Sequence, residues 1–401
     1  MSTRLFCKRA FSLTTRRLVD FSHVVIGGGV VGTAIADQLQ KIPANSVALL
    51  EQHEMLGMET TSRNSEVVHA GLYYPPDSLK ARLCIRGKEL IYGLDPHIVS
   101  YKQCAKLVVA QSEANVESLE KLLKNARTLS VPAHMVSRSS ISAKYPLLRA
   151  EYGALESPST GIMSAHELVT YCKAGFENAG GTLGLQTKVV GLEYEREMRR
   201  YVIHCMELGS KDEFTLTAEN VANSAGLHAQ KISNMLLPEE RRVSSHFAKG
   251  NYFSFAPVTP IPTSKITSKL IYPCPEPNAV GLGTHLTFNL GGQIRFGPDV
   301  EWLTDNDAEA LKYNVSSENL VAAHKAVQKY FPGVKLEELQ PSYSGIRPKL
   351  LSKSDSLRTF ADFYIEEEAG FPGFVNLLGI ESPGLTSALA IGEHVRNMYH
   401  A

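Results

Sequence analysis

Two short apolar runs, separated by a helical pattern, organise the first part of the chain. Residues 24–26 and 46–50 form the apolar runs, which Gly27 and Glu51 follow, and residues 33–40 carry helical spacing. A strand, a helix and a second strand in this order predict a βαβ unit with parallel strands. We therefore expect an α/β fold.

Helices and strands alternate less regularly along the rest of the chain. Helical periodicity predicts further helices at residues 78–94, 113–126, 164–179 and 316–330 and after the Pro383-Gly384 turn. A short strand is predicted at residues 106–110, and residues 221–226 predict a strand that runs into a glycine turn. Residues 187–217 read as a small meander, and residues 244–297 alternate apolar and polar positions between Pro and Gly, which predicts a mainly antiparallel sheet. Such a sheet suits a substrate-binding layer.

Composition narrows the class of partner. The chain has 401 residues with 41 basic and 41 acidic side chains, and it shows no basic face interleaved with aromatic residues. This balance argues against nucleic acid and favours a small neutral or anionic molecule. The 6 cysteines lack C-x-x-C spacing and the 13 histidines lack H-x-x-x-H or H-E-x-x-H pairs. We therefore expect reduced thiols and no metal site.

The amino-terminal segment has the composition of a targeting sequence. Residues 1–19 contain five basic side chains, several Ser and Thr and no acidic residue. This is typical of a mitochondrial transit peptide, and a plain basic tail is the alternative. No apolar run is long enough to cross a bilayer, so we expect no transmembrane helix and leave peripheral membrane contact open.

Three glycines follow the first predicted strand with G-x-G-x-x-G spacing. Gly27 permits the tight turn, Gly29 lets the backbone approach a pyrophosphate, and Gly32 allows close helix packing. Glu51 lies about 20 residues further on, where a carboxylate can bind ribose hydroxyls. The predicted cofactor contacts of this unit are Gly27, Gly29, Val30, Val31, Gly32 and Glu51.

Such a unit can hold either NAD or FAD. No second G-x-G-x-x-G is present, because Gly281, Gly283, Gly291 and Gly292 lack both the spacing and the strand–helix context. Segments typical of nucleotide contact recur near Ala225 and at the carboxyl end. An extended cofactor held by separate parts of the chain fits FAD better than NAD.

This reasoning predicts two domains besides the amino-terminal segment. The FAD-binding domain is predicted to comprise residues 20–90, 150–235 and 345–401. The substrate-binding domain, with a mixed antiparallel sheet, is predicted to comprise residues 91–149 and 236–344.

Longer motifs carry a family resemblance that extends over nearly the whole chain after residue 19. The run RNSEVVHAGLYYP at residues 63–75 resembles the L-2-hydroxyglutarate dehydrogenases, a group of the D-amino-acid-oxidase and glycine-oxidase-like FAD oxidoreductases. Shorter supporting pieces lie at residues 78–81, 160–162, 225–227, 249–253, 270–273, 283–287, 297–298, 344–347 and 382–386. Within the long run, Glu66 stands where the family usually has glycine.

The resemblance implies a fold and a reaction. The fold would be a Rossmann-like FAD-binding domain of the GR2 or D-amino-acid-oxidase type with a mixed antiparallel-sheet substrate domain. The reaction would oxidise a small 2-hydroxy acid, L-2-hydroxyglutarate or a close relative, to the 2-oxo acid. Electrons would pass from FAD to a quinone or another electron-transfer acceptor, and the location would be mitochondrial.

This reaction requires a base for the hydroxyl proton and cations for the carboxylates, while the cofactor takes the hydride. Neutral imidazole, with a reference pKa near ~6.5, suits the base, and both His69 and His285 lie in motifs of the resemblance. Arg347, in the predicted Gly-Ile-Arg-Pro turn, can bind a carboxylate with two hydrogen bonds. Lys249 is the predicted second cation. Arg295 and Lys349 are the alternative candidates for this second cation.

The remaining predicted contacts follow from the same motifs. Tyr73 and Tyr272 are predicted to donate hydrogen bonds to the substrate, and Tyr74 is a further donor. The start of the last helix is predicted to stabilise negative charge at the N1/O2 edge of the flavin. The resemblance implies further cofactor contacts at Ser62, Arg63, Asn64, Ser65, Ala225, Gly226, Gly345, Pro383, Gly384, Leu385 and Thr386.

Two alternatives stay open at this point. The first is an amino-acid or secondary-amine oxidase of the same superfamily, whose turnover need not depend on the two histidines. The second is a flavin-bearing mitochondrial assembly or scaffold protein without turnover. Anaerobic mixing of the yellow protein with hydroxy acids and amino acids would separate all three.

Overall fold

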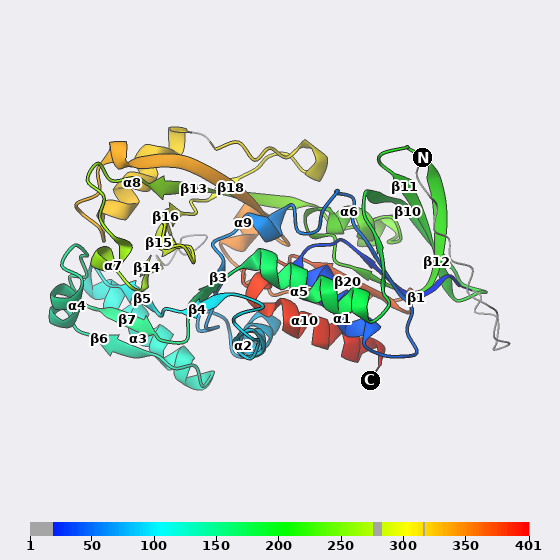
Figure 1. The fold of residues 1–401 in the computed structure, drawn as a ribbon, viewed down its shortest axis with the longest axis horizontal. Coiled ribbons are helices and arrows are strands. Elements are labelled where there is room, and N and C mark those ends of the chain that lie inside the picture. The colour runs from blue at the N-terminus through cyan, green and yellow to red at the C-terminus, as the bar shows by residue number, and fades with distance from the viewer. Residues whose placement is uncertain (1–18, 276–282, 316, 401) are drawn as a thin grey trace.

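Two large sheets lie side by side in the computed structural model, which describes residues 19–275, 283–315 and 317–400 (Figure 1). Residues 1–18, most of the predicted transit segment, lie outside the described residues, as do Gly281 and the predicted helix start at Ser316. Within the described chain, one sheet has eight strands, the other nine, and a small third sheet has three.

The eight-stranded sheet confirms the predicted βαβ unit. Its strands are β1 (Phe21–Ile26), β2 (Val47–Leu50), β9 (Thr182–Gly184), β10 (Thr187–Glu195), β11 (Arg200–Glu207), β12 (Glu213–Asn223), β19 (Tyr364–Glu367) and β20 (Phe374–Leu378). β1 runs parallel to both β2 and β12, and α1 (Val30–Gln40) connects β1 to β2. β10, β11 and the first half of β12 form the predicted antiparallel meander.

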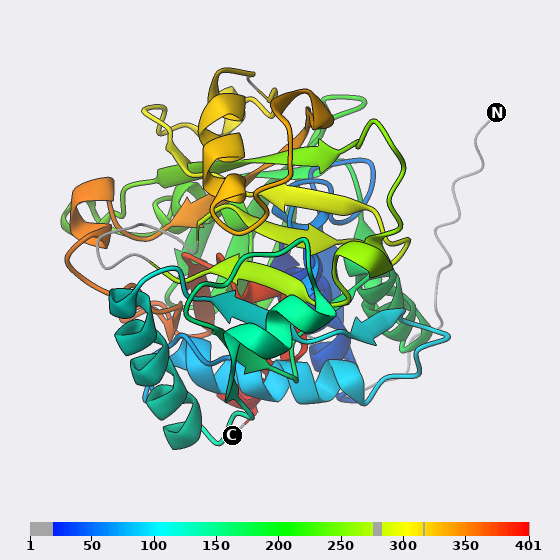
Figure 2. The same cartoon turned by 90° about the vertical axis from the view of Figure 1, so that its left-hand side faces the viewer.

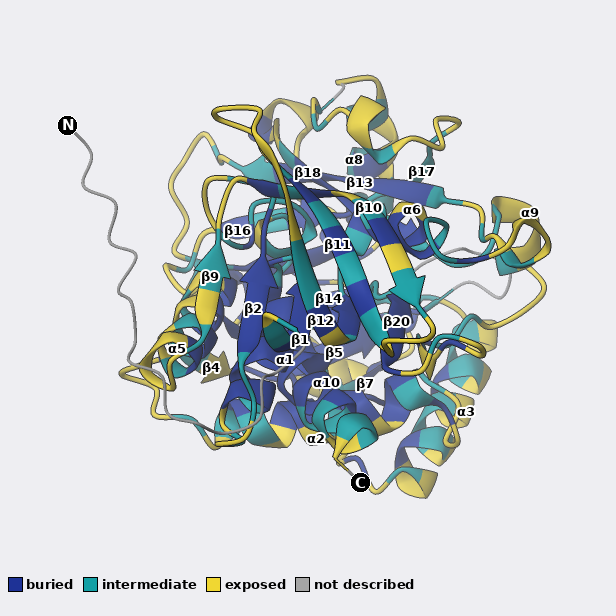
Figure 3. Cartoon of the chain, turned by 90° about the vertical axis from the view of Figure 1, so that its right-hand side faces the viewer, coloured by how far each residue is buried: buried dark blue, intermediate teal, exposed yellow. Residues whose placement is uncertain are grey.

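Helices cover one face of this sheet. They are α1, α2 (Leu79–Tyr92), α5 (Ala165–Asn178) and α10 (Gly384–Tyr399), which pack on one another below the sheet in Figure 1. Val25 faces this helical layer, whereas Val24 and Ile26 face the core on the other side of the sheet. Both faces of β1 and β2 are therefore buried, as Figure 3 shows, which explains why their sequences are continuous apolar runs.

The nine-stranded sheet is mixed and mainly antiparallel, as predicted. Its strands are β5 (Lys106–Val109), β6 (His134–Val136), β7 (Ala154–Ser157), β13 (His246–Phe255), β14 (Leu270–Pro273), β15 (His285–Phe288), β16 (Ile294–Gly297), β17 (Glu301–Trp302) and β18 (Leu339–Lys349). β13, β16, β15 and β14 pair antiparallel in this order, and β14 pairs parallel to β5 (Figure 2). Its core includes residues of α3 (Glu113–Thr128), α4 (Arg138–Lys144), α7 (Thr263–Ile266) and α8 (Leu320–Gln328).

Short elements complete the described chain. The three-stranded sheet consists of β3 (Val67–Val68), β8 (Gly161–Met163) and β4 (Tyr101–Gln103). Two short helices are α6 (Ala229–Ser233) and α9 (Lys353–Ser356). None of the helices in the described part of the chain is both long enough and apolar enough for a bilayer crossing.

Two local predictions need correction. The Gly-Ile-Arg-Pro segment at residues 345–348 is not a turn but part of β18, which among the described strands pairs only with β13 and is an edge strand there. An edge strand tolerates Pro348 because one side of its ladder needs no N–H donor. The helix expected over residues 316–330 is shorter, since α8 begins at Leu320 after a 3-10 turn.

The division into two domains stays a prediction. The strand pairing differs from the predicted boundary at one place. β7 lies within the predicted FAD-binding segment 150–235 but pairs with β5 and β6 of the other sheet.

Candidate functional site

The carboxyl ends of β1, β2 and β12 open onto two adjoining cavities. The larger, about 340 Å³, extends to β13, β15 and β18 of the second sheet, and the smaller is about 110 Å³. Their shared walls are formed by Gly29, Thr60, Thr61, Ser224 and Gly226. The cavities therefore form one elongated space at the edge where α/β sheets bind ligands.

The glycine loop has the conformation that its sequence requires. Gly27 has a φ of +101°, which a side chain rarely allows, and a Cβ at Gly32 would collide with the carbonyl oxygen of Gly27. Gly29 precedes the first turn of α1 and lines both cavities. Val30 and Val31 line the larger one. Gly32 lines neither, so it serves helix packing alone.

Glu51 lies where the sequence predicted a ribose contact. Its carboxylate accepts hydrogen bonds from the amides of Gly28 at 2.7 Å and His53 at 2.8 Å, and it lines the smaller cavity beside Gly27 and Ala225. A carboxylate has further lone pairs after these two bonds. It can therefore accept hydrogen bonds from a hydroxyl pair in the cavity.

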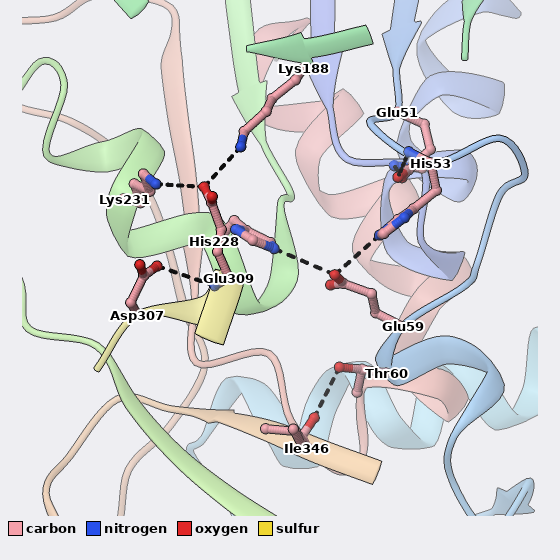
Figure 4. A network of polar contacts seen from close by, with 11 residues as sticks. Glu51, His53, Glu59, Thr60, Lys188, His228, Lys231, Asp307, Glu309 and Ile346 are labelled. Atoms are coloured by element: carbon pink, nitrogen blue, oxygen red, sulfur yellow. Dashed lines mark hydrogen bonds and ion pairs between the residues drawn. The ribbon is translucent and has the colours of Figure 1, made fainter. Parts of the chain in front are cut away.

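A network of charged side chains surrounds the smaller cavity (Figure 4). The Nε2 atoms of His53 and His228 lie 3.1 and 3.4 Å from one carboxylate oxygen of Glu59. Burial alone would raise the pKa of Glu59, but these two contacts lower it to about 2. The Glu59 carboxylate is therefore charged.

The other half of this network joins the two sheets. Glu309 accepts hydrogen bonds from Lys188 of β10 at 2.8 Å and from Lys231 of α6 at 2.7 Å. Glu309 belongs to segment 303–314, which follows β17 of the nine-stranded sheet. The segment thus crosses from one sheet to the other beside the smaller cavity.

The same segment explains the position of Lys249. Its ammonium donates a hydrogen bond to the carbonyl oxygen of Asn314 at 2.5 Å and does not line either cavity. Neighbouring Ala248 and Gly250 do line the larger cavity, so Lys249 points to the opposite face of β13. The structure therefore does not bring Lys249 to the predicted substrate site.

The loop after β2 forms one wall of the larger cavity. The Asn64 side chain donates to the carbonyl oxygens of Thr60 and Thr61 and accepts from the Glu66 amide, while the Ser65 hydroxyl lies 2.9 Å from that of Tyr252. Glu66 has a φ of +56°, the left-handed region that favours glycine. Arg63, Asn64 and Ser65 line the cavity as predicted. Ser62 does not, because it is exposed and its hydroxyl bonds to backbone carbonyls.

Both predicted histidines line the larger cavity. His285 has its Nδ1 2.9 Å from the carbonyl oxygen of Gly283, and its buried Nε2 has no hydrogen-bond partner in the described structure. His69 has its Nε2 3.4 Å from the Ser382 hydroxyl, and its buried Nδ1 likewise lacks a partner there. Burial lowers the pKa of each to about 3, the charge of Lys106 adds to this effect, and at His285 the hydrogen bond to Gly283 partly opposes it. Both imidazoles are therefore neutral, and His285 offers Nε2 as a proton acceptor.

Aromatic rings stand behind the histidines. The rings of Tyr272 and His285 stack with centroids 3.9 Å apart, and the buried hydroxyl of Tyr73 has no partner among described residues. Burial raises the pKa of both tyrosines, so their hydroxyls keep their protons and can donate hydrogen bonds. Tyr74 lines the cavity as well.

A cluster of cations lines the other side of the larger cavity. The guanidinium of Arg347 has no ion pair or hydrogen bond with any described residue. Lys349 binds both oxygens of Glu381 at 2.8 and 2.9 Å, and Lys80 lies 3.5 Å from the same carboxylate. Burial opposes ionisation of Glu381, but Lys80 and Lys349 lower its pKa, so it is charged. Of these side chains, the cations Arg347 and Lys349 and the anion Glu381 line the cavity, so this wall carries a net positive charge.

The first turn of α10 closes the larger cavity, and Pro383, Gly384, Leu385 and Thr386 line it. The Thr386 hydroxyl accepts from the His69 amide at 3.0 Å and donates to the Val67 carbonyl at 3.1 Å. The first amides of a helix have no intrahelical acceptor, so this end of α10 favours an anion or an electron-rich ring edge. Gly345 of β18 completes the wall.

The structure thus gathers most residues that the sequence singled out and adds others. Lys349, which was predicted only as an alternative second cation, lines the cavity. Glu66, Tyr252 and Glu381 also line it, although the sequence analysis assigned them no role. Arg295 instead contacts Glu66 and Tyr343. In the described ranges no group of three or more metal-ligating side chains is arranged around a common point.

The elongated space, the glycine loop, Glu51 and the start of α10 together fit an extended dinucleotide with a ring system at one end. The chain belongs to the FAD-dependent oxidoreductase family, whose model, described as FAD dependent oxidoreductase, matches residues 22–398. FAD is therefore its cofactor, which confirms that prediction.

Individual proteins are similar to this chain over most of its length. The chain is 38% identical to the mitochondrial L-2-hydroxyglutarate dehydrogenase of Arabidopsis thaliana, over 94% of this chain and 83% of that protein. It is 28% identical to the human mitochondrial enzyme of the same name, over 93% and 87% of the two chains. Among solved structures, L-alpha-glycerophosphate oxidase from Mycoplasma pneumoniae with FAD bound matches with a TM-score of 0.82 and 21% identity, over 95% of each chain. That likeness confirms the fold.

Proposed function

We propose that the protein oxidises L-2-hydroxyglutarate, or a close 2-hydroxy dicarboxylate, to the 2-oxo acid. The observation that carries this proposal is that one cavity is lined by both the Nε2 of His285, which has no hydrogen-bond partner among the described residues, and the guanidinium of Arg347. The first is a neutral base and the second an anion-binding group. The names of the plant and human relatives support the choice of substrate.

The charge of the cavity suits a dianion. Arg347 can bind one carboxylate in a bidentate manner, and Lys349, which also lines the cavity, favours a second. A carboxylate taken out of water without such partners would cost several kcal/mol. A neutral or singly charged substrate leaves part of this positive charge uncompensated.

The proposed roles follow from the contacts. With a carboxylate on Arg347, the C2 hydroxyl would donate its proton to Nε2 of His285, whose Nδ1–H stays on the Gly283 carbonyl. The Tyr73 hydroxyl would donate a hydrogen bond to the substrate. FAD, when bound, accepts the hydride from C2. Loop residues Arg63 to Ser65 and the start of α10 would hold the cofactor.

Anaerobic mixing of the FAD-loaded protein with single substrates tests the proposal. The panel contains L- and D-2-hydroxyglutarate, L-lactate, L-malate, glycine, sarcosine and glycerol 3-phosphate, and the readout is loss of visible flavin absorbance. We expect L-2-hydroxyglutarate to bleach the flavin fastest at equal concentration. Faster bleaching by glycine or sarcosine would establish the amine-oxidase alternative, and no bleaching by any compound would favour a protein without turnover.

We further propose that electrons leave the cofactor for a quinone or another electron-transfer acceptor rather than for oxygen. The relatives' designation as dehydrogenases supports this choice. Turnover with a soluble quinone analogue should exceed turnover with dissolved oxygen alone. Equal rates would contradict this proposal and leave the substrate proposal intact.

We also propose a mitochondrial location. The basic, acid-free composition of residues 1–19 and the mitochondrial relatives support it. A fluorescent protein fused after residue 401 should accumulate in mitochondria, and deletion of residues 1–19 should abolish this accumulation. Unchanged distribution after the deletion would contradict the proposal.

A further inference from the structure

Lys106 is a buried cation directly behind the larger cavity. It begins β5, and its relative exposure of 1% is the lowest of the buried lysines in the described chain. Its ammonium lies 4.4 Å from the ring centroid of Tyr73 and 4.6 Å from that of Tyr272. It forms no hydrogen bond or ion pair with any described residue. A buried ammonium without a carboxylate is costly, and a buried titratable group of this kind beside a cavity is a candidate functional residue.

Aromatic contacts connect Lys106 to the side chains that line the larger cavity. Tyr272 lies within cation–π distance of Lys106 and also stacks on His285 at 3.9 Å, with an angle of 11° between the rings. Lys106, Tyr272 and His285 therefore form a continuous chain of contacts from β5 to the proposed base. Tyr73 forms a second chain from the same ammonium to the substrate side of the cavity.

We propose that Lys106 is a positioning residue of the oxidation: its ammonium fixes the rings of Tyr73 and Tyr272 and, through Tyr272, the ring of His285. A cation over a desolvated aromatic ring is attracted by the negative face of that ring. Two rings that share one cation are thereby fixed relative to each other. This inference rests on the proposed function, because it assigns the orientation of the base in that reaction.

The charge of Lys106 acts in the same direction as its contacts. It adds to burial in lowering the pKa of His69 and His285, which favours the neutral imidazole that the reaction needs. Burial lowers the pKa of Lys106 itself to about 7. A dianionic substrate in the cavity would favour its charged form. The titratable groups that touch Lys106 or interact with its charge are Tyr73, Cys84, His69, Tyr272 and His285.

Substitution of Lys106 by methionine removes the charge and keeps most of the side-chain volume. Because the ammonium has no described counter-ion, we expect Lys106→Met to fold and to bind FAD with unchanged affinity. We expect the limiting rate of anaerobic flavin reduction by L-2-hydroxyglutarate to fall at least tenfold. Lys106→Arg should recover part of that rate. Lys88→Met is the matched control, because Lys88 is also a buried lysine but, among the described residues, has no cation–π contact with Tyr73 or Tyr272.

A spectroscopic readout separates this inference from the proposed function. Nitrogen-15 NMR of labelled histidine should find His285 as the Nδ1–H tautomer in the wild-type protein and a mixture of tautomers in Lys106→Met, with assignment from His285→Gln. This comparison needs no substrate. If L-2-hydroxyglutarate fails to reduce the wild-type flavin, the proposed function is lost while the tautomer result still decides the role of Lys106.

A second variant, Tyr272→Leu, covers the case in which Lys106→Met folds poorly, and a double-mutant cycle of the two tests the path through Tyr272. If Lys106 acts through Tyr272, then Tyr272→Leu should shift the His285 tautomer in the same way, and adding Lys106→Met to it should change little further. A wild-type reduction rate and a wild-type tautomer in Lys106→Met would overturn the proposal. Fully additive effects of the two substitutions would overturn the path through Tyr272.

Discussion

Replacement of Arg347 by methionine tests the proposed substrate contact most sharply. The side chain lies on β18 with its guanidinium in the larger cavity and has no partner in the described protein. Methionine keeps a similar length and removes only the charge and the donors. We therefore expect the fold and FAD binding to persist while the affinity for the dicarboxylate falls.

The magnitude follows from the surroundings of Arg347. Loss of one partner of a buried charged pair costs about 3–5 kcal/mol. The lower end applies here, since Arg347 is only half-buried and the cations around Glu381 still attract the substrate. About 3 kcal/mol corresponds to about a hundredfold weaker binding.

Anaerobic stopped-flow reduction of the flavin measures this effect. The dependence of the observed rate on L-2-hydroxyglutarate concentration gives the substrate Kd and the limiting rate separately. Arg358→Met is the matched control, because Arg358 is an exposed arginine outside both cavities. A change of less than threefold in Kd for Arg347→Met would refute the assignment, whatever happens to the limiting rate.

Three further outcomes are expected. His285→Asn should lower the limiting rate of flavin reduction about 10²–10³-fold in the same experiment, and a loss below tenfold would move the base elsewhere. The pKa of His285 is about 3 in the folded protein. Below its unfolded value of ~6.5 only the unfolded chain takes up the proton, so stability falls as the pH drops. Urea unfolding should register a loss of about 1.6 kcal/mol from this group between pH 6.5 and 5, which His285→Gln should abolish. Glu309→Gln should speed FAD release about two- to fivefold at low salt, measured by flavin fluorescence, with a smaller difference at high salt; equal release at low salt would show that segment 303–314 does not retain the cofactor.

The sequence predicted the cofactor-binding half of the molecule well because its signals are local. The βαβ unit, the glycine spacing and Glu51 lie within about 25 residues of one another, a distance typical of this motif. In the structure Gly27 and Gly32 lie so close together in the tight turn that a side chain on Gly32 would collide with the carbonyl oxygen of Gly27. Comparable local spacing predicted the helices α2, α3, α5 and α10.

The substrate half depends on strand register, which the sequence did not reveal. Lys249 was predicted as the second cation, with Lys349 only as an alternative, and the segment around Arg347 was predicted to be a turn. In an edge strand, Arg347 and Lys349 are two residues apart and share a face, whereas Lys249 alternates with the cavity-facing Ala248 and Gly250. Recognition of residues 339–349 as a strand would have indicated Lys349.

The burial of Lys106 could not be predicted from the sequence for a different reason. It stands at the start of the apolar run KLVV, where a lysine is ordinarily expected at the exposed end of a strand. Its burial depends on Tyr73 and Tyr272, which come from distant parts of the chain. No local pattern brings these three residues together.

A crystal structure of the protein loaded with reduced FAD and L-2-hydroxyglutarate, grown without oxygen or other acceptor, tests the central claim most directly, because reduced flavin leaves the C2 hydroxyl of the substrate intact. We expect one carboxylate on the Arg347 guanidinium, the C2 hydroxyl within hydrogen-bond distance of Nε2 of His285, and C2 facing the flavin. A ligand whose carboxylates avoid Arg347, or whose hydroxyl lies away from both His285 and His69, would contradict the account.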